Sequence, residues 1–564
     1  MTAGGRAARR GRLLVLLLLV AAGALGLPAG PARAAGTTTW TGLGADDSWN
    51  DPGNWDAGVP GPADTAVVRR LGGGPAFPEL PAGLTVAGLV LGEGGNMHGG
   101  SIAVTGSLTW SGGSLQSLVE LGATSTAVIS TAVPGSAPVL QSPGGLVNRG
   151  VLVFVAGTHL HIVGSVIDNR GALRLADGSV LDNHVCCVSP TSTLLNSGTV
   201  DARPGLATLD ALVLDNTGTI LLESSATLAL SLAPSALHPA SQIKGSGRLL
   251  VQQRAALDLS GEITLAPAVT VELADALVTG SASLVGGTFA WTGGDIDADL
   301  TLASPTRLAV SGAAAKAIGD PGSLTSTGRA TVTGTSTITL RGGGSSFTNA
   351  GTMTQSGAVT WSAAGCCASP ATWRNSGTYI NAVPAAATTL MDGIAVRNTG
   401  AVVLRSGRLA TRLLGYLQTA GSTQLAGGSL VVPTGLVDIR EGQLTGHGSV
   451  TGAVRNAGTV SPHGTTTGAA GTMSITGSYV QTTSGTLLLD LFGPTVDRFD
   501  RLLASGRCTR GGTLQVSLGA GFSPSSGSFV VLTGSPTNGS FATVQLPSAT
   551  WRLTTTTGRT VVRR

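Results

Sequence analysis

Aromatic and charged side chains are both scarce in this chain of 564 residues. Phe, Trp and Tyr make up 4% of it, and Asp, Glu, Lys and Arg make up 11%, whereas charged residues are about a quarter of a typical soluble domain. This composition excludes a compact helical enzyme. The hydrophobic content of 42% also argues against disorder, which needs low hydrophobicity and high net charge.

A basic surface is also missing once the first 34 residues are set apart. Arginines precede an apolar run over residues 13–27, and Ala32-Arg33-Ala34 has the small-x-small pattern of a signal-peptidase site. We therefore expect a signal peptide over 1–34, cleaved near Ala34, and a secreted or cell-surface product. The remaining chain has 28 basic and 29 acidic residues, which predicts no nucleic-acid partner. No later apolar run is long enough to predict a membrane span.

The tripeptide Asn-x-Gly recurs along the chain and is followed by alternating Thr, Val and Leu. Spacings within its two clusters are 20 to 27 residues, the length of one supersecondary unit. Its positions are Asn148, Asn169, Asn196, Asn216, Asn349, Asn375, Asn398 and Asn456. Because Asn and Gly both tolerate positive φ, we expect the backbone to turn sharply at each tripeptide.

Between these turns, alternating apolar and polar residues predict short strands at 151–155, 172–175, 219–222 and 401–404. One turn of two or three strands per repeat, stacked on the next, predicts an all-β fold. We expect a right-handed parallel β-helix (β-solenoid) with N-terminal and C-terminal capping units. In such a fold the core is a column of small aliphatic side chains, so few aromatics are needed.

A second periodicity of about 180 residues overlies the first. Trp110 matches Trp291, and Asn169 matches Asn349, with Cys-Cys-x-Ser-Pro present in both copies. We therefore predict a signal peptide at 1–34, a Trp/Asp-rich N-terminal cap with the first coils at 35–106, duplicated solenoid blocks at 107–287 and 288–460, and a β-rich C-terminal unit at 461–564.

Both ends carry further motifs. Trp40-Thr41-Gly42, Asp47-Ser48-Trp49, Asn54-Trp55 and residues 58–67 lie near the start, and Asp500-Arg501-Leu502, residues 511–514, Gly521-Phe522, residues 529–532 and 539–542 lie near the end. With the Asn-x-Gly coils between them, they resemble bacterial secreted and surface β-helix repeat proteins, related to autotransporter passenger domains and adhesins. That resemblance implies an extracellular β-helix. The 104 residues after position 460 are too few for the membrane barrel of a typical autotransporter.

The paired cysteines Cys186, Cys187, Cys366 and Cys367 suit export, which favours oxidation. In one continuous solenoid the two pairs would lie roughly 38 Å apart, so no disulfide joins them. Each pair could close on itself as a vicinal disulfide or remain as small apolar thiols. Cys508 is then left without a partner.

Histidines and acids offer weaker metal hypotheses. His159 and His161 share a strand face, and His184 follows about one coil later, but the duplicate block lacks equivalents. We therefore assign no metal ligands. Asp295, Asp297 and Asp299 alternate along one strand and could bridge calcium; the alternative is a solvated strand face. The Asp cluster around Trp49 and Trp55 is expected to satisfy turn amides.

Trp110 and Trp291 occupy equivalent places and could stack on sugar rings; the alternative is packing against the solenoid. Gly446-His447-Gly448 resembles one signature of pectin-degrading glycosidases, but the paired carboxylates of that chemistry are not found beside it. We assign no catalytic or cofactor-binding residue and no cofactor. The predicted function is a non-catalytic structural or adhesive β-solenoid for cell-wall or extracellular glycans or surface proteins. The alternative is a polysaccharide lyase or glycoside hydrolase.

Overall fold

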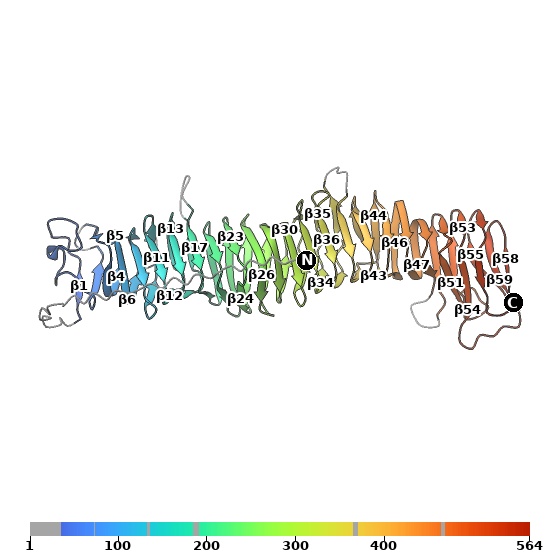
Figure 1. The fold of residues 1–564 in the computed structure, drawn as a ribbon, viewed down its shortest axis with the longest axis horizontal. Coiled ribbons are helices and arrows are strands. Elements are labelled where there is room, and N and C mark those ends of the chain that lie inside the picture. Colours follow the sequence, from blue (N-terminus) through green and yellow to red (C-terminus); the bar gives the residue numbers. More distant parts are fainter. Residues whose placement is uncertain are drawn as a thin grey trace, which may run out of the picture.

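The protein is an all-β parallel solenoid of about 18 turns. The computed structural model describes residues 35–70, 72, 74–131, 136–183, 191–364, 370–463 and 469–564. Figure 1 shows one long rod, with strands following one another from end to end. Within these ranges the only helix is the single-turn 3-10 helix η1 (Pro52–Asn54). The prediction of an all-β parallel β-solenoid is confirmed.

Each turn of the solenoid consists of three short strands, because a strand pairs with the third strand after it. In one turn these are β14 (Val166–Asn169), β15 (Ala172–Leu175) and β16 (Val180–Asp182), and their partners in the next turn are β17 (Thr193–Asn196), β18 (Thr199–Ala202) and β19 (Gly205–Asp210). All three pairings are parallel. The predicted strands are found as β12 (Val151–Phe154), β15, β21 (Thr219–Leu222) and β43 (Ala401–Ser406).

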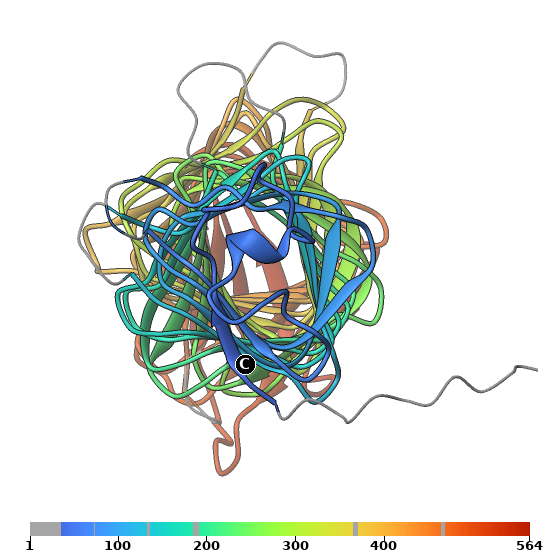
Figure 2. The ribbon, with the colours of Figure 1, turned by 90° about the vertical axis from the view of Figure 1, so that its left-hand side faces the viewer.

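The core is a narrow column inside the stacked turns. Alternate residues of each strand face inward, so β12 buries Leu152 and Phe154 while Val151 and Val153 lie at the surface. Leu152 is in register with Leu173, and Leu173 with Val200. Viewed along the rod, successive turns superimpose around this one column (Figure 2). A few aliphatic side chains per turn therefore fill the interior, which explains the scarcity of aromatics.

In the middle of the rod, two of the three strands of a turn are joined into one longer strand. β26 (Ala256–Leu265), β28 (Leu277–Val285) and β30 (Gly294–Ala303) are nine or ten residues long and pair directly with one another. The predicted boundary between blocks at 287/288 falls inside this continuous ladder. The backbone pairing is continuous across this predicted boundary.

The asparagines of the Asn-x-Gly tripeptides point into the protein and form ladders. Each side-chain amide donates to the next asparagine's Oδ1, at 2.7 Å from Asn148 to Asn169 and 2.6 Å from Asn169 to Asn196 and from Asn196 to Asn216. A second ladder joins Asn349, Asn375, Asn398 and Gln418. The side-chain Nδ2 of Asn169 also donates to the carbonyl of Thr199, so buried polar groups satisfy one another.

The expectation that Asn and Gly occur in these tripeptides because they tolerate positive φ is wrong. None of their Asn or Gly residues has positive φ. Instead the glycines stack so closely that a Cβ on Gly198 would lie 2.2 Å from the carbonyl oxygen of Gly171. The same holds for Gly218 above Gly198, at 2.3 Å. Glycine is required here by the approach of neighbouring turns.

The N-terminal end holds a cluster of tryptophans enclosed by polar turns. Trp40, Trp49 and Trp55 are buried and pack edge to face, with ring centroids 5.2 and 4.7 Å apart. Asp51 accepts the backbone N–H groups of Ala45 and Gly53, and Asp56 accepts that of Thr39. The prediction that these acids satisfy turn amides is confirmed. That this segment acts as a cap stays a prediction.

The C-terminal end departs from parallel pairing. β59 (Arg559–Arg563) lies between β55 (Ser528–Thr533) and β58 (Arg552–Thr555), antiparallel to both. Phe529 packs against Trp551, with centroids 5.8 Å apart. In the described ranges no helix is both long and apolar enough to span a membrane.

Candidate functional site

The two tryptophans proposed for glycan stacking are in the core. Trp110 and Trp291 have 0% of their surface exposed. Each indole donates its N–H to a nearby backbone carbonyl, that of Gly112 and of Gly294, at 3.1 Å in both cases. Stacking on a sugar needs an exposed ring face, so this prediction is wrong. Both residues sit on inward positions of their strands and fill the column.

The four paired cysteines, Cys186, Cys187, Cys366 and Cys367, lie outside the described residues, as does His184. Their vicinal disulfides stay a prediction. Cys508, on β53 (Cys508–Arg510), is fully buried. Burial raises the pKa of its thiol to about 11, so the sulfur stays protonated at neutral pH. It packs as a small apolar residue rather than as a reactive thiol.

An acidic groove of about 480 Å³ lies beside the predicted calcium strand β30. Arg254, Asp275, Asp295 and Asp297 line it. Asp297 and Asp299 are exposed and Asp295 is half-buried, so the three acids share the outer face as predicted. Asp295 pairs with Arg341 at 2.8 Å, and Asp299 accepts a hydrogen bond from Ser323. The acids therefore have separate partners, and calcium binding stays a prediction.

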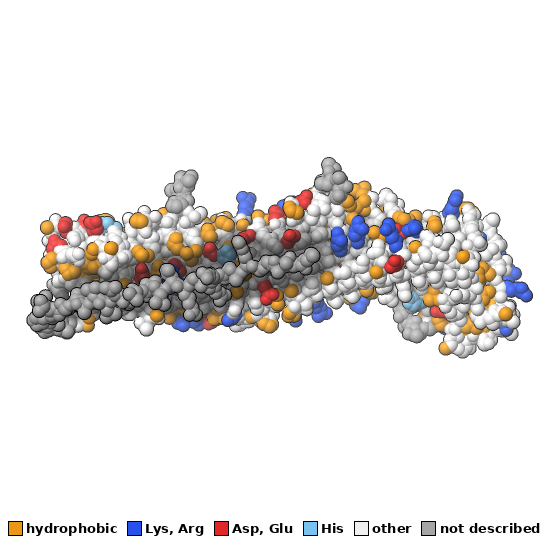
Figure 3. Space-filling view, viewed as in Figure 1, with side chains coloured by type: hydrophobic (Ala, Val, Ile, Leu, Met, Phe, Trp, Pro, Cys, Tyr) orange, Lys and Arg blue, Asp and Glu red, His pale blue; other side chains and the backbone are white. Residues whose placement is uncertain are grey.

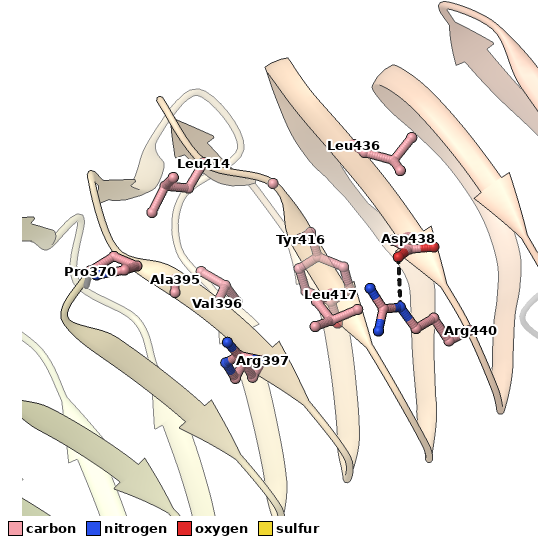
Figure 4. Close-up of a pocket in the computed structure, with 11 residues that line it drawn as sticks. Pro370, Ala395, Val396, Arg397, Leu414, Tyr416, Leu417, Leu436, Asp438 and Arg440 are labelled. Carbon is pink, nitrogen blue, oxygen red and sulfur yellow. Dashed lines mark hydrogen bonds and ion pairs between the residues drawn. The ribbon is translucent and has the colours of Figure 1, made fainter. Parts of the chain in front are cut away.

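A second groove, of about 300 Å³, combines apolar walls with arginines (Figure 4). It crosses β42 (Ala395–Asn398), β45 (Tyr416–Gln418) and β46 (Ser422–Ile439). Its apolar lining comes from Pro370, Val396, Leu414, Leu417 and Leu436, and its cationic edge from Arg397 and Arg440.

The charges at this second groove are unevenly paired. Asp438 binds both Arg440 and Arg455, at 2.9 Å each. Arg397 is in register with Arg374 of the preceding turn, and both are exposed and make no ion pair with a described residue. Two like charges directly opposite each other on neighbouring strands repel. An anionic ligand group would relieve that repulsion.

A third constellation joins two histidines and one aspartate. β13 (His159–Val163) carries His159 and His161 on its outer face, and Asp182 lies on β16 of the next turn. His159 Nε2 lies 2.9 Å from Asp182 Oδ2, and His161 Nδ1 lies 2.7 Å from Oδ1. Sequence analysis found the histidines but missed Asp182, because the pairing of β13 with β16 is what brings it there.

Among the residues that the structure describes, His447 has no acidic partner of the kind that a glycosidase signature requires. It lies on β47 (Gln443–Asn456), in register with Ala426. Its Nδ1 is buried and makes no hydrogen bond within the described chain, and none of the ion pairs there includes it. The resemblance to pectin-degrading glycosidases therefore gains no support at this position.

No protein-family model matches the chain, and no curated protein shows significant sequence similarity to it. The functional conclusions therefore come from the geometry of the fold and its grooves.

Proposed function

We propose that this chain is an exported, non-catalytic structural or adhesive β-solenoid. Its ligands are cell-wall or extracellular glycans or surface proteins. The observation that carries the proposal is the unbroken parallel ladder of about 18 turns. A rigid rod presents the same kinds of outward side chain at every turn, so weak contacts along its length add up through multivalency.

The surface composition supports contact with polar ligands. Along the face seen in Figure 3 the surface is mostly uncharged, with acidic and basic side chains scattered over it. Hydroxyl and amide groups of Ser, Thr and Asn exchange hydrogen bonds readily with sugar hydroxyls.

The second groove, which Arg397 and Arg440 line, offers a contact point for such a ligand. Arg397 in the groove and Arg374, in register with it on the preceding turn, supply two guanidinium groups with planar donor geometry suited to carboxylates or sulfates. Leu414, Leu417 and Leu436 beside them would cover the apolar face of a sugar ring. Acidic glycans are therefore the preferred ligand class within this proposal.

A glycan array of neutral and acidic sugars, scored for both binding and cleavage, tests the proposal. We expect binding without cleavage, strongest for acidic glycans. The double variant Arg374→Ser/Arg397→Ser should weaken acidic-glycan binding by at least about tenfold, because the loss of one charge-assisted contact alone has that effect. Arg307 and Arg329 form another in-register pair, in a groove whose lining includes no leucine. Arg307→Ser/Arg329→Ser is therefore the matched control and should bind normally.

Export has its own test. Expression in a secreting bacterial host, followed by N-terminal sequencing of the released protein, should give a chain that starts near Ala35. Retention of the intact chain inside the cell would contradict the exported part of the proposal while leaving glycan binding open to the array.

The acidic groove is the observation that favours the alternative function, a polysaccharide lyase or glycoside hydrolase. Asp295 and Asp297 are two residues apart on one strand and line the same groove, and glycosidases use two carboxylates. No Trp or Tyr is among the described residues that line this groove, and Arg341 neutralises Asp295. Release of reducing ends or unsaturated products, lost in Asp297→Asn, would favour this alternative over the adhesive proposal.

A further inference from the structure

The cluster of His159, His161 and Asp182 has the arrangement of a metal site. One nitrogen of each imidazole and one carboxylate oxygen all lie within 4.8 Å of one another. The two rings approach each other with centroids 4.5 Å apart, tilted by 48°. Among the described residues, no other group of three His, Cys, Asp or Glu side chains converges in this way.

The backbone ladder fixes the positions of all three side chains. His161 is directly in register with Asp182, and His159 lies two residues earlier on the same face. Between them Leu160 and Leu181 point inward and are fully buried, which anchors both strands. The backbone N–H of His159 donates to Thr131 Oγ1 at 3.0 Å. The fold therefore holds the three side chains in place, so little conformational entropy would be lost when an ion binds.

The local charge also favours a cation. Asp210 is in register with Asp182 in the following turn, so two carboxylates lie one above the other. No Arg or Lys forms an ion pair with Asp182 or Asp210 in the described chain. The ion-pair contacts of Asp182 in the described chain are those with the two imidazoles.

We propose that His159 Nε2, His161 Nδ1 and the Asp182 carboxylate bind a divalent first-row transition ion of the zinc type. Zinc lies about 2.0–2.2 Å from His nitrogen and carboxylate oxygen. A tetrahedral ion with these bond lengths separates two ligand atoms by about 3.3–3.4 Å, so the N···O distances of 2.7 and 2.9 Å would widen by about half an ångström when the ion replaces the two hydrogen bonds. Imidazole ligands select zinc, copper or nickel over calcium and magnesium.

Partial exposure leaves room for further ligands. The side chains of His159, His161 and Asp182 are 41%, 23% and 13% exposed. The ion would be reached from solvent, and water would complete its coordination. It would also clip two successive turns together, since β13 and β16 belong to neighbouring coils.

The site belongs to the first of the two homologous blocks. At the offset of 180 residues, His159, His161 and Asp182 correspond to Thr339, Arg341 and Ser362. Arg341 instead binds Asp295. The sequence analysis assigned no metal because the second block lacks these histidines. The contacts among His159, His161 and Asp182 in the first block do not depend on the residues of the second block.

Calorimetric titration of the metal-free full chain with Zn²⁺, after alkylation of its cysteines, tests the proposal. We expect saturable binding of one equivalent. Loss of a group that only supports a ligand costs about 10–100-fold in metal affinity, so Asp182→Asn and His161→Gln should each weaken binding at least about tenfold. Asp215 and His238 form a single His–Asp pair at 2.8 Å elsewhere on the rod, so Asp215→Asn is the matched control and should bind as the wild type does.

Titration with Co²⁺ gives a second readout that does not need a variant. Ligation by two imidazoles and a carboxylate should produce visible d–d absorption, which zinc then removes stoichiometrically. Absence of saturable zinc binding, absence of that absorption, or binding that Asp182→Asn and His161→Gln leave intact in folded protein would each overturn the proposal.

Discussion

At the scale of the residue, a small number of buried polar side chains stabilise this fold through hydrogen-bond networks. Each ladder asparagine donates to a polar side chain of the next turn, in most cases the next asparagine, and to a backbone carbonyl, so a polar column runs beside the aliphatic one. Tyr379, Tyr416 and Tyr479 are also fully buried, and burial raises the pKa of each phenol. Their hydroxyl groups hydrogen-bond to inward polar side chains such as Gln355, Thr423 and Gln481. Such networks fix the register of the turns, because one displaced turn leaves several groups unpaired.

Replacement of a ladder asparagine should therefore be costly. Asn375 donates to Asn398 Oδ1 at 2.8 Å and to the Ala401 carbonyl at 3.0 Å, and it accepts from Asn349. Asn375→Ala removes these hydrogen bonds and leaves their buried polar partners without a hydrogen-bonding group. The free energy of unfolding should therefore fall by about 2–3 kcal/mol. Urea unfolding followed by circular dichroism measures this. The exposed neighbour Arg374→Ala should change it little; equal effects would contradict the ladder's role.

Asp500 should make stability depend on pH. It is fully buried and accepts the N–H groups of Gly471 and Asp490, and burial raises its pKa to about 7. Since the unfolded chain has a lower pKa of about 3.9, the folded state holds the proton more tightly between these values. The contribution of Asp500 to stability is then fully present below about pH 4 and is lost as pH rises through 7.

Thermal unfolding at pH 5 and pH 8 checks this dependence. The wild type should melt a few degrees lower at pH 8, and Asp500→Asn should remove much of that difference. Asp497→Asn, an exposed neighbour on the same connection, is the control and should retain it. An unchanged difference in Asp500→Asn would mean that other groups are responsible.

At the scale of the element, the unit is a turn of three short strands joined by tight corners. A strand of four residues is not stable alone, and each turn buries its apolar face only against the turns on either side. Corners must therefore stack as closely as strands do. The glycines of Asn-x-Gly allow this, because a side chain there would meet the carbonyl of the turn below.

Gly198→Ala should accordingly disturb the stack. Its Cβ would lie 2.2 Å from the Gly171 carbonyl oxygen, so the corner must shift, at a cost of about 1–3 kcal/mol. A fall in the midpoint of urea unfolding measures this. Gly74→Ala, where a Cβ would meet nothing within 4 Å, is the matched control. Unfolding midpoints that fall equally in both variants would argue against close stacking as the reason for glycine.

At the scale of the whole molecule, about 18 turns at about 4.8 Å give a rod roughly 86 Å long. Stability comes from contacts between neighbouring turns, so it is distributed along the rod. The two ends are exceptions, because an uncovered end presents unpaired strand edges to other molecules. At the C-terminal end, β59 covers β55 with antiparallel pairing.

Removal of residues 547–564 tests whether this end is a cap. The deletion takes away β58 and β59 and exposes the edge of β55, so we expect end-to-end association, measured by light scattering during size-exclusion chromatography. Adding Val530→Lys, a charge on an outward position of that edge, should restore the monomer. A truncated chain that stays monomeric at the same concentration would contradict a capping role.

The sequence alone determined the β-solenoid, because the repeat length and the alternation of Val, Leu and Thr are local properties that every turn shares. Asn169, Asn196 and Asn216 could be assigned to neighbouring layers from their spacing. Tertiary structure decided what local pattern cannot encode. Trp110 and Trp291 are core residues because their side chains lie on the inner face of their strands, and only the tertiary structure shows which face is inner. The register between turns decided that Asp182 meets two histidines and that Arg374 lies opposite Arg397, because residues 20 or more positions apart become neighbours only when the coils stack.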